Sequence, residues 1–380
     1  MEVSFNCLIL FLIHLPLYLN QKTFIIEFKN TEISYTTRYT LGNSNLSTEI
    51  YLNSEHIVVG TWSYLGSKSN TSKLIEDKSY QTYLGVFSIY EYQDYISFPN
   101  NDNKFIIQFE IQDDDSIFAR CNSGFGLGKN DSIIKEKSII NQLKENNLIE
   151  HLSYTISPYE RKEDYYYIGK IYFGETPDEV IRNKKYKSRY HVTYNNEVGW
   201  FFNVSYIKLR NNVHIKPPKI MLQTEETSIK LPLEDLDVFK EYYFTKDIIL
   251  KYCPTKGDPL VTMDIECDCS VIYELPDLEM VIGNYSFLFK PKDLFKEQKG
   301  KCMFKIRGDF ISHSHWIFGL NFINLFITNF DYENNIITFY SDVVTMKEIN
   351  SFSVVITLFQ ISTVLMLICS ILLFISIQYK

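Results

Sequence analysis

Short β-rich runs, separated by clusters of Asn, Ser and Gly, recur along most of this 380-residue chain. Examples are TFIIEF at residues 23–28, TEIYL at 48–52, VFSIY at 86–90 and KFIIQFEI at 104–111. Alternation of apolar and polar residues over such short runs is typical of half-buried strands. Aromatic residues, which favour strands, make up 16% of the chain. The sequence therefore predicts a largely β, mostly antiparallel protein.

Helical patterns are rare between these runs. Ile139, Ile140, Leu143 and Leu148 would share one face of a short helix at residues 138–148. A second helical stretch covers residues 233–243, and residues 200–209 read as a strand pair. The similar order in both halves suggests a duplication, and 380 residues suffice for two lobes. We expect an N-terminal lobe at residues 21–190 and a C-terminal lobe at residues 191–347.

Both ends of the chain are apolar. Residues 7–19 have the length of a signal-peptide core, so we expect a secretory signal at residues 1–20, or an uncleaved anchor. Residues 351–377 carry no charge. They are long enough for a transmembrane helix, expected at residues 352–377, although a removable lipid-anchor signal is the alternative. We therefore expect a single-pass protein of the secretory pathway, at the cell surface, the vacuole or another endomembrane, with its body outside the cytoplasm.

The cysteines and glycosylation triplets are compatible with that compartment. Five Asn-x-Ser/Thr triplets begin at Asn45, Asn70, Asn130, Asn203 and Asn284. Five cysteines lie between the apolar ends, namely Cys121, Cys253, Cys267, Cys269 and Cys302. One or two disulfides are plausible, with one thiol left over.

Charge and motif content exclude several classes of function. The net charge is −8 and no segment carries a basic stripe, so nucleic acid is not an expected partner. His313 and His315 could face one side of a strand, but no Cys or carboxylate completes a metal site. The run Asp113-Asp114-Asp115 lacks the alternating ligands of a calcium loop. We expect no metal and no cofactor.

Three motifs point to one family. Residues 316–339 read WIFGLNFINLFITNFDYENNIITF, a turn containing Ile-x-Gly-x-x-Phe followed by two strands. Residues 124–128 read GFGLG ahead of the helical pattern, and the pair Leu231-Pro232 occurs in the second half of the chain. Over roughly residues 36–342 the chain resembles the pepsin-like aspartic peptidases, the eukaryotic aspartyl protease family. The resemblance implies an all-β, bilobal fold with a few short helices. It also implies a Cys269–Cys302 disulfide, with Cys253–Cys267 as a weaker second pair.

The resemblance also locates the two catalytic loops. In that family each lobe supplies an Asp-Thr/Ser-Gly loop, and the two carboxylates share a proton. Counted from Gly42, the first loop falls on Asn53-Ser54-Glu55; counted back from Leu231-Pro232, the second falls on Gln223-Thr224-Glu225. Both aspartates are thus replaced by amides, which cannot take a proton from water near neutral pH. The resemblance therefore implies a degenerate member with no functional catalytic residue.

Other residues of the site follow from the same resemblance. Ser54 and Thr224 keep the loop hydroxyls that cross-link the lobes. Glu55 and Glu225 could form a displaced carboxylate pair, although two solvated or locally hydrogen-bonded glutamates are the simpler interpretation. The tyrosine of the flap, the hairpin over the cleft, corresponds to Tyr90 or Tyr92, unless these are ordinary strand aromatics.

Three functions remain open at this point. The leading hypothesis is a membrane-anchored, inactive homologue that binds an extended peptide or protein in the interlobe cleft. The first alternative is an active endopeptidase with atypical catalytic residues, working at acidic pH. The second is a structural surface glycoprotein that uses the fold as a scaffold.

Overall fold

The computed structural model describes most of the body of the chain. The described residues are 23–30, 34–52, 57–60, 69–82, 85–99, 101, 103–112, 124–129, 138–163, 166–184, 186–192, 199–210, 213–217, 219–253, 265–282, 285–309, 315–341 and 346–348. The expected signal and transmembrane helix lie outside these ranges. Within them, no helix combines the length and the apolar character that crossing a membrane requires.

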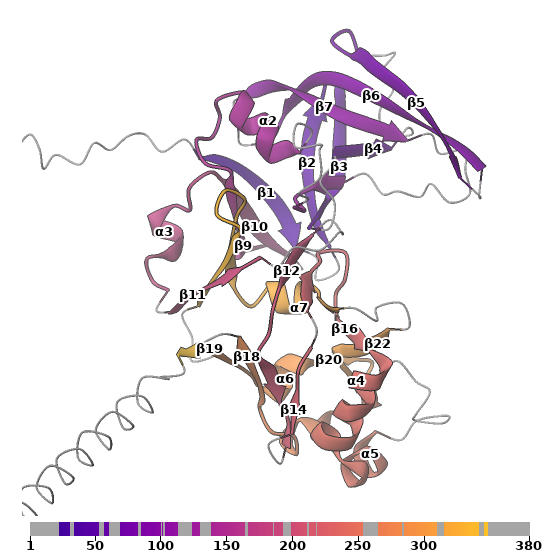
Figure 1. The fold of residues 1–380 in the computed structure, drawn as a ribbon, viewed down its shortest axis with the longest axis vertical. Coiled ribbons are helices and arrows are strands. Elements are labelled where there is room, and N and C mark those ends of the chain that lie inside the picture. Colours follow the sequence, from indigo (N-terminus) through magenta and orange to yellow (C-terminus); the bar gives the residue numbers. More distant parts are fainter. Residues whose placement is uncertain are drawn as a thin grey trace, which may run out of the picture.

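The largest sheet has 13 strands and runs through both lobes (Figure 1). In spatial order its strands are β11 (Tyr186–His191), β25 (Ile336–Ser341), β24 (Ile327–Asp331), β9 (Ser153–Glu163), β10 (Tyr166–Phe173), β1 (Phe24–Asn30), β2 (Tyr35–Leu41), β3 (Ser44–Tyr51), β8 (Gly124–Gly126), β4 (Ile57–Gly60), β7 (Lys104–Gln112), β6 (Gly85–Ser97) and β5 (Lys73–Thr82). Strands β24 and β25 come from the end of the body, yet β24 pairs with β9. The two lobes therefore share a continuous sheet, and the expected boundary near residue 190 falls inside it.

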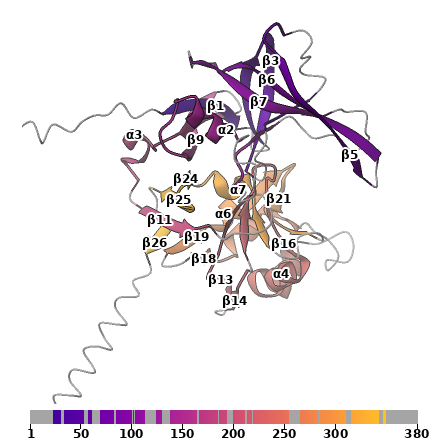
Figure 2. The ribbon, with the colours of Figure 1, turned by 45° about the horizontal axis from the view of Figure 1, so that its top comes forward.

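Within the described residues, three smaller sheets build the C-terminal lobe. The first contains β12 (Trp200–Phe202), β15 (Ile220–Leu222), β23 (Trp316–Phe318), β16 (Ile229–Pro232) and β22 (Ile306–Asp309). The second contains β14 (His214–Ile215), β13 (Tyr206–Lys208), β18 (Leu278–Ile282), β19 (Tyr285–Phe289) and β26 (Met346–Glu348). The third contains β17 (Glu266–Cys267), β21 (Lys301–Phe304) and β20 (Phe295–Gln298). Figure 2 shows β24 and β25 beside β11, between these sheets and the N-terminal lobe.

The helices are short and lie around the sheets. They are α2 (Ile139–Glu145), α3 (Asp178–Ile181), α4 (Leu233–Val238), the π-helix η4 (Phe239–Phe244), α5 (Lys246–Tyr252), the 3₁₀-helix η5 (Cys269–Tyr273), α6 (Pro291–Leu294) and α7 (Leu320–Ile323). Ser138 caps α2 by accepting a hydrogen bond from the backbone of Asn141, and Ile139, Ile140 and Leu143 are buried as expected. The helix ends at Glu145, short of the expected residue 148, so Leu148 lies beyond it and is only partly buried. The second expected helix corresponds to α4 and η4.

One expected pairing is wrong. Residues 200–209 do form two strands, β12 and β13, but these belong to different sheets. Strand β12 pairs with β15, whereas β13 pairs with β14 and β18. Residues 203–205 join the two strands without any turn, so the chain passes from one sheet to the next instead of folding back.

A buried aromatic cluster packs at the junction of the lobes. Trp200 of β12 contacts Phe330 and Tyr332 with ring centroids 5.0 Å apart in each case, and Tyr154 stacks on Phe330 at 4.8 Å. The carbonyl oxygen of Leu127 accepts hydrogen bonds from Trp200 Nε1 at 2.7 Å, Tyr154 OH at 2.8 Å and Tyr332 OH at 2.9 Å. Burial raises the pKa of the Tyr154 hydroxyl. One carbonyl of the N-terminal lobe therefore holds side chains from three other segments.

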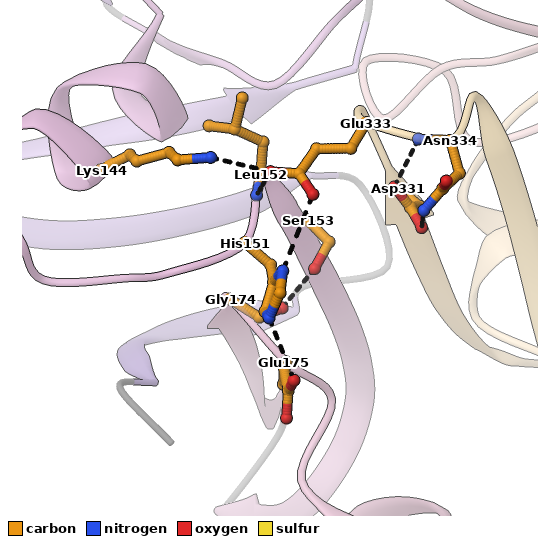
Figure 3. A network of polar contacts seen from close by, with 9 residues as sticks. All are labelled: Lys144, His151, Leu152, Ser153, Gly174, Glu175, Asp331, Glu333 and Asn334. Carbon is orange, nitrogen blue, oxygen red and sulfur yellow. Dashed lines mark hydrogen bonds and ion pairs between the residues drawn. The ribbon is translucent and has the colours of Figure 1, made fainter. Parts of the chain in front are cut away.

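A surface network adds polar links beside this cluster (Figure 3). Glu333, in the turn between β24 and β25, accepts hydrogen bonds from Lys144 of α2 at 2.8 Å and from the backbone of Leu152 at 3.1 Å. His151 lies between Glu175, at 3.2 Å, and Glu333, at 3.7 Å. The bond from Lys144 holds the pKa of Glu333 below its usual value. Exposed ion pairs contribute at most about 1 kcal/mol each, so this network is secondary to the aromatic cluster.

Candidate functional site

The tripeptide Phe-Gly-Leu occurs once in each lobe, at residues 125–127 and 318–320, and aligns the two halves of the site. Phe125 lies opposite Ile50 in the parallel pair of β3 and β8. Phe318 lies opposite Leu222 in the parallel pair of β15 and β23. In each lobe, the residue that follows this strand partner, Ile50 or Leu222, therefore begins the equivalent loop.

Those two equivalent residues are Tyr51 and Gln223. Tyr51 lies opposite Gly126, and the backbone N–H of Gln223 donates to Phe318 at 3.1 Å, which continues the pairing by one step. In the C-terminal lobe this register puts Gln223 directly after the strand partner of Phe318. In the first lobe the strand register points to Tyr51 instead of Asn53. Asn53, Ser54 and Glu55 themselves lie outside the described residues.

The difference in the first lobe has a simple physical origin. An ungapped count from Gly42 assumes that every turn between two strands keeps its length, whereas hydrogen bonds between β3 and β8 fix the register directly. With this register the first loop reads Tyr51-Leu52-Asn53 and the second reads Gln223-Thr224-Glu225. Neither strand end presents a carboxylate, because a phenol and an amide stand at the two equivalent positions.

Thr224 forms a hydrogen bond between the two lobes. Its side chain is buried, and its Oγ1 donates to the carbonyl oxygen of Ile50 at 2.5 Å. The equivalent position of the other lobe is Leu52, which is also buried but has no hydroxyl to return such a bond. The cross-link that the resemblance implies is therefore made from the C-terminal side by Thr224.

Glycines bring the two loops close to their neighbours. A Cβ atom on Gly124 would lie 2.0 Å from the ring of Tyr51, so this ring packs directly on the glycine backbone. A Cβ atom on Gly319 would lie 2.3 Å from the carbonyl oxygen of Glu226. Since real Cβ atoms do not approach so closely, a larger residue at position 124 would displace the Tyr51 ring, and one at position 319 would clash with the backbone of Glu226 and Ser228.

Two carboxyl groups flank the strand ends. The hydroxyl of Tyr51 donates to Glu49 Oε2 at 2.9 Å. Burial raises the pKa of Glu225 to about 7, and the negative charge of Glu49 adds to the rise, against hydrogen bonds that lower it. Among the described residues, Gln223 Oε1 is buried without a hydrogen-bond partner. The sequence gives no local feature that marks Glu49 as a neighbour of Glu225.

The two candidate flap tyrosines lie away from the tip of their hairpin. Strands β5 and β6 form this hairpin, and Thr82 lies opposite Gly85 at its tip. Tyr90 lies opposite Asp77 and Tyr92 opposite Leu74, both nearer the base. The ring of Tyr92 stacks on Phe109 at 6.2 Å, as expected of a strand aromatic. Tyr80, the tyrosine of β5, lies opposite Phe87 and close to the tip. Gly85 is the residue that marks this turn in the sequence.

Both expected disulfides are present in the C-terminal lobe. Cys269, at the start of η5, bonds to Cys302 of β21, and Cys253, after α5, bonds to Cys267 of β17. They close loops with sequence separations of 33 and 14 residues, respectively. Together they tie the helical edge of this lobe to its smallest sheet, remote in sequence from the two loops.

The remaining candidates lie partly inside and partly outside the described residues. No group of His, Cys, Asp or Glu in the described ranges is arranged to hold a metal ion. His315 is buried against Phe201, with ring centroids 5.5 Å apart, while His313 and the Asp113 run lie outside these ranges. A cavity of about 350 Å³ opens on the N-terminal lobe beside Phe28 and Arg38, but neither loop lines it.

Replacing Thr224 with valine tests the link between the lobes. Valine keeps the volume of the side chain but leaves the buried carbonyl of Ile50 without its donor. We expect the free energy of unfolding, measured by urea denaturation, to fall by about 1–3 kcal/mol. Thr40→Val is the matched control, because Thr40 bonds to Asn45 at the surface and should change stability by no more than about 0.5 kcal/mol. Equal effects of the two substitutions would contradict the assigned role.

Comparisons with known proteins agree with this geometry. The family described as eukaryotic aspartyl protease matches residues 64–341 of the chain. The crystal structure of an aspartic proteinase from Irpex lacteus superposes with a TM-score of 0.65 at 16% sequence identity, covering 87% of this chain and 99% of that one. No curated protein matches the sequence. The family match covers well over half of the chain, and the fold has the pepsin-like architecture, so the chain belongs to the eukaryotic aspartyl protease family.

Proposed function

We propose that this protein binds an extended peptide or protein segment between its two lobes without cleaving it. The main observation in support is the pair of residues at the equivalent strand ends, Tyr51 and Gln223. The mechanism of the family needs a carboxylate at each of these two positions. A phenol and an amide can each donate or accept hydrogen bonds. Neither can serve as the general base that activates water near neutral or acidic pH.

The proposal also includes a membrane anchor and a location in the secretory pathway, and both rest on the sequence. The apolar ends of the chain support a secreted body tethered by one span at residues 352–377. The asparagines of three glycosylation triplets, Asn45, Asn70 and Asn203, have exposed side chains, which is compatible with a glycoprotein. A purely structural surface glycoprotein would share these features but would bind no peptide between the lobes.

A second candidate function has one observation in its favour. Glu225, with its pKa near 7, and Glu49 supply a carboxyl group from each lobe close to the strand ends. An active endopeptidase could use such a displaced pair as acid and base. It is the weaker proposal, because Glu49 precedes its strand end whereas Glu225 follows its own, so the two side chains do not start from equivalent backbone positions.

Cleavage of a denatured protein substrate by the full-length chain separates these functions. We expect no cleavage between about pH 3 and about pH 7, with or without a statine-type inhibitor, because the equivalent loop positions lack carboxylates. A labelled statine-type peptide should nevertheless bind, as measured by fluorescence polarisation. Inhibitable cleavage by the unmodified protein would favour the Glu49 and Glu225 pair, and absence of binding would favour the structural glycoprotein.

Two revertants test the placement of the first loop within the same assay. Tyr51→Asp combined with Gln223→Asp restores carboxylates at the positions that the strand register makes equivalent. Asn53→Asp combined with Gln223→Asp follows the sequence count instead. If restored carboxylates bring back cleavage, we expect the gain in Tyr51→Asp/Gln223→Asp and no gain in Asn53→Asp/Gln223→Asp. Gain in the second alone would show that the sequence count is correct.

A further inference from the structure

We propose that the cavity between strands β1 and β2 of the N-terminal lobe binds a small amphiphilic acid. The acid group would lie on Arg38, and the apolar part of the ligand would enter the gap between the two strands. The cavity has a volume of about 350 Å³, at the small end of the range for small-molecule sites. Because the two loops at the junction of the lobes do not line it, the inference is independent of the proposed function.

The cavity exists because the sheet forks at β2. Strand β1 pairs with β2 only through residues 29–30 and 35–36, and β2 then pairs with β6 through residues 40–41. The two strands diverge from the point at which they pair (Figure 1). Across the gap, the hydroxyl of Thr37 donates a hydrogen bond to the carbonyl oxygen of Glu27 at 2.8 Å. A side-chain bond thus replaces the backbone ladder at this point and leaves the gap open beside it.

The lining residues show that the cavity passes from the outer face of the sheet toward the core. Burial alternates along β1, so that Ile26 and Phe28 lie in the core and Glu27 lies on the outer face. All three residues line the cavity. The lining also includes Phe98, which is buried and contacts Phe24 edge-on with ring centroids 5.7 Å apart. The inner wall is therefore apolar and held in place by the packing of the core.

The outer part of the cavity combines an apolar wall with hydrogen-bond donors. Pro99 and Ile168 line it together with Arg38 and Ser47. Arg38 and Ser47 lie directly opposite each other on β2 and β3, and both are exposed on the outer face. Side chains at such positions are close enough to contact the same group. A guanidinium binds a carboxylate through two parallel hydrogen bonds, and the serine hydroxyl can add a third.

The charges around the cavity favour an anion over a cation. Its described lining carries two cations, Lys29 and Arg38, against one carboxylate, Glu27. Glu27 lies directly opposite Lys170 of β10, a placement in which opposite charges attract. Within the described part of the chain, no carboxylate forms an ion pair with Arg38. A ligand with an acid group and an apolar body therefore complements both the donors and the walls of the cavity.

Calorimetric titration of the full-length protein at neutral pH with octanoate tests this inference. Octanol and octylamine carry the same chain on a neutral and a cationic head group, so they serve as matched ligands. We expect octanoate to bind more tightly than octanol and octylamine to bind least. Equal affinities for the three ligands, or no binding of octanoate, would overturn the proposal.

Substitution of Arg38 locates the acid group. Arg38→Gln should weaken octanoate binding roughly 10- to 100-fold, because a charge-assisted hydrogen-bonding partner is lost. The control is Arg182→Gln, an exposed arginine at the end of α3 that does not line the cavity and should leave the affinity unchanged. Octanoate bound to the apolar ends of the chain would not respond to Arg38. Equal effects of the two substitutions would therefore contradict the site.

Two further variants test the sign of the charge and the cavity itself. Arg38→Glu should reverse the preference, so that octylamine binds more tightly than octanoate. Ile168→Trp places a larger ring in the cavity and should weaken octanoate and octanol alike, with folding of each variant checked by circular dichroism. Unchanged affinities in Ile168→Trp would show that octanoate binds Arg38 on the open surface and would overturn the cavity assignment. Peptide binding between the lobes is a separate measurement, so either proposal can fail without the other.

Discussion

Replacing both Cys269 and Cys302 with alanine should lower the free energy of unfolding by about 4 kcal/mol. The disulfide closes a loop with a sequence separation of 33 residues, and its main effect is to restrict the unfolded chain. It joins the start of η5 to β21, so its loss also frees the edge of the C-terminal lobe. Urea denaturation under oxidising conditions measures the effect directly.

The second disulfide is the matched control for loop length. Cys253 and Cys267 close a loop with a separation of only 14 residues in the same part of the lobe. Replacing this pair with alanine should cost about 3 kcal/mol, roughly 0.8 kcal/mol less than replacing the longer-loop pair. A larger loss from the shorter loop would show that local packing outweighs the restriction of the unfolded chain.

Replacing Trp200 with alanine should lower the free energy of unfolding by about 3–5 kcal/mol. The side chain is completely buried and contacts Tyr154, Phe330 and Tyr332. Its Nε1 donates to the carbonyl of Leu127 at 2.7 Å. Alanine would therefore leave a cavity at the junction of the lobes and remove one bond that connects them. Urea denaturation monitored by circular dichroism would measure the loss.

Trp200→Phe separates packing from hydrogen bonding at this position. Phenylalanine keeps most of the aromatic contact but has no N–H group. The carbonyl of Leu127 would retain the hydroxyls of Tyr154 and Tyr332, so it would not lose all its donors. We expect a loss of about 1–2 kcal/mol, well below that of alanine. Equal losses for the two variants would show that the hydrogen bond, and not the ring, carries the stabilisation.

Local features of the fold were predictable because they depend on neighbouring residues. Ser138 and the apolar face at Ile139, Ile140 and Leu143 specify α2, since a cap and a helical period lie within a few residues of one another. The all-β character follows in the same way from short strand patterns. The spacing of Cys269 and Cys302 was interpretable only through the family resemblance, because spacing alone does not determine how cysteines pair.

The candidate site was only partly predictable. The count along the sequence puts the second loop at Gln223 and Thr224 because Leu231-Pro232 lies close to them in the chain. The count from Gly42 puts the first loop at Asn53, whereas the pairing of β3 with β8 makes Tyr51 the counterpart of Gln223. The resemblance puts the flap tyrosine at Tyr90 or Tyr92 on β6, whereas the tip of the hairpin lies at Thr82 and Gly85. Each difference concerns a register between strands, which a count along the sequence does not contain.

The sequence by itself determined the class of fold, the family and the absence of an Asp-Thr/Ser-Gly loop, since these depend on which residues are present and in what order. Only the tertiary structure decided which residues face each other across the lobes. Ile50 and Thr224 are 174 positions apart, yet one hydrogen bond joins them. Glu49 influences Glu225 for the same reason: the fold brings together the ends of two strands that belong to different sheets, and burial there strengthens the interaction between their charges.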